Sequence, residues 1–160
     1  MPPALKRTEP AYASIRAADI PEITGAGVRV RVIAGRVDDV EGPMVLTSPT
    51  LFAHIRLDAG ATSTLSVDPT LELGLYVLDG AIDVDTPLGS GAIAVLTQGS
   101  RLTVTATKDG PADVALLGGA PVEGPFLFSG PLVMDTPERL AQAKRDYAEG
   151  RMGTLDGVPF

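Results

Sequence analysis

Short apolar segments separated by glycine and proline constrain the fold of this chain more than any other feature. The segment VRVRVIA (28–34) alternates valine with arginine, as expected of a strand with one buried face. Similar segments follow at intervals of about ten residues, and GLYVLDGAIDVD (74–85) predicts a hairpin turning at Asp79-Gly80. The chain has 18 Gly and 14 Pro among 160 residues. This rhythm predicts an antiparallel β-sandwich or barrel.

Only the end of the chain has the signals of a helix. Thr136 suits an N-cap, Pro137 suits the first helical position, and Gly150 suits the C-terminal cap. The apolar stripe between them is thin, so the helix packs by a narrow face. We expect an extended N-terminal arm over 1–27, the barrel over 28–134, a C-terminal α-helix over 135–151, and a tail over 152–160.

Composition excludes several classes of protein. The chain has no cysteine and a single histidine, so it has neither a disulfide framework nor a thiolate metal site. Its formal charge of −7 argues against direct binding of nucleic acid, which needs clustered Lys and Arg. The first residues have no apolar segment typical of a signal peptide, and no apolar run is long enough to span a membrane. We expect a cytoplasmic protein.

Two glycines have the spacing of the metal-binding motif of cupin barrels, in which two histidines and a glutamate stand between them. Counting forward from Gly60 locates the two histidine positions of the motif, and counting back from Gly80 locates its glutamate position. A second cupin motif locates a third histidine position. The four positions are occupied by Ser66, Asp68, Leu73 and Leu102. An Fe, Mn or Zn site of imidazoles needs several nitrogen donors. The spacing therefore predicts an all-β, RmlC-like cupin barrel with no metal ligands and no cofactor.

Four segments resemble the C-terminal cupin domain of the pirin family. PPALKRTEPAYASIRAADIPEI (2–23) is similar to the pirin linker, and GVRVRVIAG (27–35) is similar to the strand that opens the second barrel. LDAGA with YVLDGAIDV resembles the glycine turn and hairpin of that barrel. The ending, GPLVMDTPERLAQAKRDYAEGRMG (130–153), is close to the terminal strand and helix of the family. Together these segments cover nearly the whole chain.

The resemblance implies as much about what is missing as about what is present. Pirins contain two cupin barrels, of which the N-terminal barrel binds iron and the C-terminal barrel usually lacks a metal. The family is associated with quercetin dioxygenase activity and with redox-dependent transcriptional co-regulation, both of which depend on N-terminal residues. Because the resemblance begins in the middle of a pirin, no catalytic residue of the family is expected at any position of this chain.

The remaining candidates for chemistry are weak. His54 and Arg56 share one face of a strand, where a structural role is the simpler interpretation. Asp68 would act as an acid or base if desolvation at the barrel mouth raised its pKa, although VDPT is also an ordinary turn. The residues expected to line a cavity are Ser66, Asp68, Leu73, Leu75 and Leu102.

Two functions remain open at this point. In the first, the chain is a metal-free module that binds a small hydrophobic molecule or another protein. In the second, it is a metal-independent enzyme, for example an isomerase, cyclase or lyase, that works in the barrel cavity. Under either interpretation we expect a partner barrel or a second copy to cover an exposed face, so a homodimer is predicted.

Overall fold

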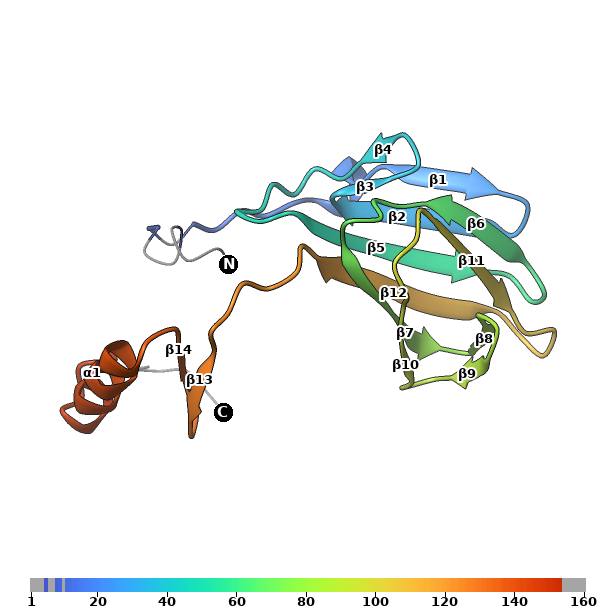
Figure 1. Cartoon of the computed structure of the whole chain (residues 1–160). Coiled ribbons are helices and arrows are strands. Elements are labelled where there is room, and N and C mark those ends of the chain that lie inside the picture. Colours follow the sequence, from blue (N-terminus) through green and yellow to red (C-terminus); the bar gives the residue numbers. More distant parts are fainter. Residues whose placement is uncertain (1–4, 6–7, 10, 154–160) are drawn as a thin grey trace. The chain divides into compact units, whose positions relative to one another are not determined.

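The computed structural model describes residue 5, residues 8–9 and residues 11–153, which form two compact units (Figure 1). The barrel unit ends at Pro121, and the terminal unit begins at Val122. Most of the predicted tail, from 154 on, and parts of the arm lie outside the described residues. Among the described residues, no helix combines the length and apolar character needed to cross a membrane.

A six-stranded antiparallel sheet forms one layer of the barrel unit (Figure 1). Its order is β1 (Glu22–Gly25), β2 (Val28–Ala34), β5 (Thr50–Leu57), β12 (Ala112–Gly119), β7 (Glu72–Asp79) and β10 (Ile93–Val95). The arm predicted over 1–27 therefore ends inside this sheet, because residues 22–25 pair with β2.

A four-stranded sheet forms the second layer of the barrel unit. Its order is β6 (Thr62–Ser66), β11 (Arg101–Ala106), β8 (Ala81–Asp83) and β9 (Pro87–Gly89). Alternate residues of both sheets point inward and form one core of mainly Val, Leu, Ile and Ala side chains. The all-β prediction is confirmed, and the 28–34 segment has the alternation expected, with Val30 and Val32 fully buried.

The hairpin predicted at Asp79-Gly80 is not formed. Strand β7 pairs with β12 and β10, whereas β8 pairs with β11 and β9 in the other sheet. The dipeptide is therefore a corner at which the chain passes from one sheet to the other. Gly80 has a φ of +75°, and a Cβ at this position would lie 2.2 Å from the carbonyl oxygen of Pro111. An Asp-Gly pair signals a tight turn, but it does not specify which strands pair afterwards.

The terminal unit contains a small hairpin and the predicted helix. The hairpin joins β13 (Leu127–Ser129) to β14 (Leu132–Met134), and α1 spans Pro137–Ala148. Thr136 caps the helix as predicted, since its hydroxyl accepts a hydrogen bond from the Arg139 amide at 3.2 Å. Strands β13 and β14 fall within the range 28–134 predicted for the barrel; they pair with each other and belong to the terminal unit.

Candidate functional site

Two cavities open at one end of the barrel unit. The first, with a volume of about 690 Å³, lies between the hairpin of β3 (Arg36–Val37) and β4 (Val40–Glu41), the loop 43–49, and the segment after β6. The second has a volume of about 540 Å³. Val67 and Leu71 line both, so the two cavities are neighbours. Both volumes lie in the range typical of small-molecule sites.

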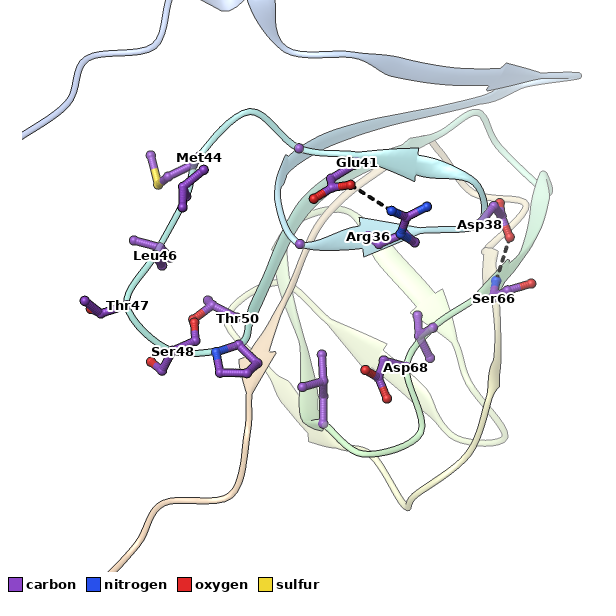
Figure 2. A pocket seen from close by; sticks show the side chains of 16 residues that line it. Arg36, Asp38, Glu41, Met44, Leu46, Thr47, Ser48, Thr50, Ser66 and Asp68 are labelled. Atoms are coloured by element: carbon purple, nitrogen blue, oxygen red, sulfur yellow. Dashed lines mark hydrogen bonds and ion pairs between the residues drawn. The ribbon is translucent and has the colours of Figure 1, made fainter. Parts of the chain in front are cut away.

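Hydrogen bonds hold the walls of the first cavity in place (Figure 2). The backbone amide of Ser66 donates to Asp38 Oδ1 at 2.7 Å, and the Asp38 amide donates to the Ser66 carbonyl at 3.0 Å. This pair fastens the β3–β4 turn to the end of β6. Arg36 donates to Glu41 Oε2 at 2.7 Å across the same hairpin. The polar groups of this wall therefore already have partners within it.

The outer wall of the first cavity comes from a loop that sequence reasoning missed. Met44 and Leu46 line the cavity from the loop 43–49 (Figure 2), and the exposed Val45 between them also belongs to the lining. The sequence did contain a signal for this wall, because three consecutive apolar residues, 44–46, lie between two prolines. An apolar run in a loop is not buried by strand pairing, so it indicates packing against another surface or a ligand.

The second cavity exists because two strands part. Strands β11 and β8 pair only at Thr105 with Asp83 and at Ala106 with Ile82. Farther toward Arg101, β11 pairs with β6 alone, and a gap opens beside β8. The rim of this cavity carries Asp83, Asp85 and Arg101. The aliphatic part of its lining is Val67, Leu71, Leu73, Val84, Leu96 and Leu102.

The predicted lining residues are divided among these surfaces. Ser66 and Asp68 border the first cavity, and Leu73 and Leu102 border the second. Leu75 is fully buried in the core and is not among the lining residues of either cavity.

Ser66 lies on the outward side of β6, together with Thr62 and Thr64. The neighbouring Val67 is buried and packs with the core. Counting residues from Gly60 thus ends one step away from the inward side of the strand.

Asp68 was considered as an acid or base whose pKa would be raised by desolvation at the barrel mouth, and the structure does not support this. Its carboxylate accepts hydrogen bonds from the Thr70 hydroxyl at 2.7 Å and from the Thr70 amide at 2.8 Å. These two bonds hold the pKa of Asp68 below its ordinary value of 3.8. The side chain is exposed and ionised at neutral pH, which is the state expected for a turn residue.

His54 and Arg56 lie on the outer side of the six-stranded sheet. His54 Nε2 lies 2.9 Å from Asp113 Oδ1, and Arg56 Nη1 donates to Asp113 Oδ2 at 2.7 Å. Arg56 and Asp113 are directly opposite each other in the β5–β12 register, so this is a cross-strand charged pair. The three candidate catalytic residues therefore do not meet in one site.

The residues present do not fit a transition metal. Leu73 and Leu102 have no donor atoms, Ser66 faces outward, and the carboxylate of Asp68 is engaged by Thr70. Within the described residues, no group of three or more His, Cys, Asp or Glu side chains could hold an ion. Iron or zinc sites require such convergence.

Comparison with known proteins connects this barrel to one family. The model of the pirin C-terminal cupin domain matches residues 52–153. Human pirin is 27% identical over 153 residues, which cover 92% of this chain and 53% of that protein. A pirin-like protein of Caulobacter vibrioides is 31% identical over 140 residues, covering 87% of this chain and 47% of that protein.

A solved structure agrees with these sequences. A crystal structure of quercetin 2,3-dioxygenase from Acinetobacter baumannii matches with a TM-score of 0.78 and 31% identity, over 90% of this chain and 51% of that one. This chain spans about half the length of the relatives it matches. The cupin barrel predicted from the glycine spacing is thereby confirmed, and the chain belongs to the pirin family, in which it corresponds to the C-terminal cupin domain.

Proposed function

We propose that this domain is a metal-free binding module that holds a small, largely apolar molecule at the mouth of the barrel. The proposal rests mainly on where the structure puts the four positions that hold metal ligands in the cupin motif. All four border the two cavities, and the two in the second cavity are leucines. A barrel that keeps the cavity but replaces donor atoms by aliphatic side chains favours binding through apolar contact.

The polar groups around the first cavity support the same ligand class. Arg36 is paired with Glu41, and Asp68 with Thr70. A charged ligand would have to displace these partners, whereas an apolar ligand would contact Met44, Val67 and Leu71 without disturbing them.

Quercetin is a suitable first probe, because the Acinetobacter baumannii relative carries the name quercetin 2,3-dioxygenase. Its flat aromatic rings can contact the aliphatic side chains that line both cavities. We derive no reaction for it in this domain, since the metal that a dioxygenase uses does not fit the residues present. His54 and Arg56 also lie outside the cavity lining, so no observation favours the enzymatic alternative.

The proposal is tested by titrating the protein with quercetin in a calorimeter, comparing wild type with Leu71→Arg. Leu71 lines both cavities, so an arginine there fills the shared wall with a charge. We expect binding to wild type and at least about a tenfold weaker affinity in the variant, which corresponds to about 1.4 kcal/mol. Leu46→Asp, at a half-exposed position of the outer wall, gives a second variant with less risk to folding.

The control is Val95→Arg, which adds the same charge at a position that lines neither cavity. It should bind quercetin like wild type. Equal affinity in all four proteins would contradict a mouth site, and absence of binding by folded wild type would contradict quercetin-like ligands.

A further inference from the structure

The outer side of the six-stranded sheet carries a continuous apolar surface. Its members all point away from the core and are more than a third exposed. They are Phe52 on β5, Leu117 on β12, Tyr76 and Leu78 on β7, and Ile93 and Val95 on β10. We call these six residues the outer apolar face.

The strand register makes this face continuous. Phe52 lies opposite Leu117, and Leu117 lies opposite Gly74, which lies opposite Val95. In the next row, Ala115 lies between His54 and Tyr76, and Tyr76 lies opposite Ile93. Residues directly opposite on one side of a sheet have Cβ atoms about 5 Å apart. Five of the six side chains are therefore neighbours within these two rows, and Leu78 follows Tyr76 two residues on along β7, in a third row.

The size of the face is close to what a dimer requires. From their exposed fractions, the six side chains present roughly 500 Å² of apolar surface, near the upper end of the largest patches on monomers. A standard interface buries about 800 Å² on each partner, and about 65% of a homodimer interface is apolar. Those two values correspond to about 520 Å² of apolar surface per subunit, which is close to what this face presents.

Charge also permits a second copy at this position. The chain as a whole has a formal charge of −7. The same side of the sheet, however, is closer to neutral, because it carries Arg29, Arg31 and Arg56. Their acidic counterparts on that side are Glu22, Glu72, Asp79 and Asp113, and Arg31 Nε lies 3.2 Å from Glu22 Oε1. Two copies that meet here would therefore face a small net charge rather than the −7 of the whole chain.

We propose that the outer apolar face is a self-association surface on which a second copy of this chain docks. The two sheets pack face to face across a two-fold axis, so that the β10–β7–β12 region of one copy covers the same region of the other. The arginines on β2 and β5 then lie at the ends of the contact, where they stay hydrated. Tyr76, in the middle row, is the central aromatic contact.

This surface is independent of the proposed ligand site, because no member of the outer apolar face lines either cavity. The two proposals can therefore fail separately. Leu71→Arg should lose quercetin and keep the dimer, whereas a charge on the face should lose the dimer and keep quercetin.

The experiment is size-exclusion chromatography with light scattering, from about 1 to 100 μM, on wild type, Val95→Arg and Ile93→Arg. Both positions are more than half exposed and belong to β10 at the sheet edge, so the arginine adds no buried charge to the monomer. We expect wild type at twice the 16.5 kDa chain mass and both variants at the chain mass, with dissociation constants raised at least about tenfold.

Val45→Arg is the matched control, since it replaces a valine that is 93% exposed in the loop 43–49 and lines the first cavity, which no member of the outer apolar face lines. It should remain a dimer. A wild type that stays monomeric at 100 μM overturns the proposal. So does a dimer that both β10 variants preserve, or one that Val45→Arg disrupts as strongly as they do.

Discussion

At the scale of single residues, Asp68 is an ionised turn residue rather than the catalytic acid or base that the sequence suggested. Its position at the barrel mouth suggested an acid or base, but two hydrogen bonds from Thr70 stabilise its ionised form. The depressed pKa makes Asp68 a pH-dependent contributor to stability.

The sign of that contribution follows from linkage. The folded-state pKa lies below the ordinary value of 3.8, so the stabilisation is complete above that value and disappears as the pH falls through the folded-state pKa. We expect Thr70→Val, which removes the hydroxyl donor but keeps the amide, to raise the pKa of Asp68 toward its ordinary value. Carboxyl titration by NMR measures this shift. An unchanged pKa in the variant would show that the hydroxyl contributes nothing.

At the scale of structural elements, the corner between β7 and β8 decides how the two sheets are joined. Gly80 occupies a left-handed conformation and touches the backbone at Pro111, so it meets two separate requirements for glycine. Most of the strands around it were predictable, because alternation identifies strands well. Their pairing was not, because a local Asp-Gly signal carries no information about the distant strands β11 and β12.

Two glycine substitutions separate these requirements. Gly91 has a φ of +84°, and a Cβ there would meet nothing within 4 Å. We expect Gly91→Ala to lower the free energy of unfolding by about 1 kcal/mol, the cost of the left-handed conformation. Gly80→Ala should cost about 2–4 kcal/mol, because it adds a collision with the Pro111 carbonyl. Urea denaturation of both variants measures the difference, and equal costs would contradict the tight contact at the corner.

The cavities mark the limit of prediction from the sequence. The positions located from the glycine spacing do border the cavities, because the glycines of the cupin motif are present although its metal ligands are not. These positions are Ser66, Asp68, Leu73 and Leu102. The wall formed by Met44 and Leu46 depends on how a loop packs beside a hairpin, which no periodicity encodes. The outer apolar face was equally hidden, because its six members come from four strands that only the sheet order brings together.

At the scale of the whole molecule, the expected chemistry is that of a domain without a resident metal. We predict that protein purified without chelators contains iron, manganese, nickel and zinc at far below one equivalent, because the former ligand places offer no converging donors. Elemental analysis of the purified chain tests this directly. A stoichiometric metal would mean that other residues form the site, and Asp83 and Asp85 at the rim of the second cavity would be examined first.

The alternation of inward and outward residues along β6 has a consequence for the engineering of this barrel. Ser66 points outward, whereas Val67 belongs to the core. Putting histidines back at positions 66 and 68 would therefore leave at least one imidazole on the far side of the strand from Leu73 and Leu102. A designer who wished to give this domain a metal centre would have to rebuild the interior around Val67. The outward direction of position 66 therefore opposes a metal site here as much as the absence of histidine side chains does.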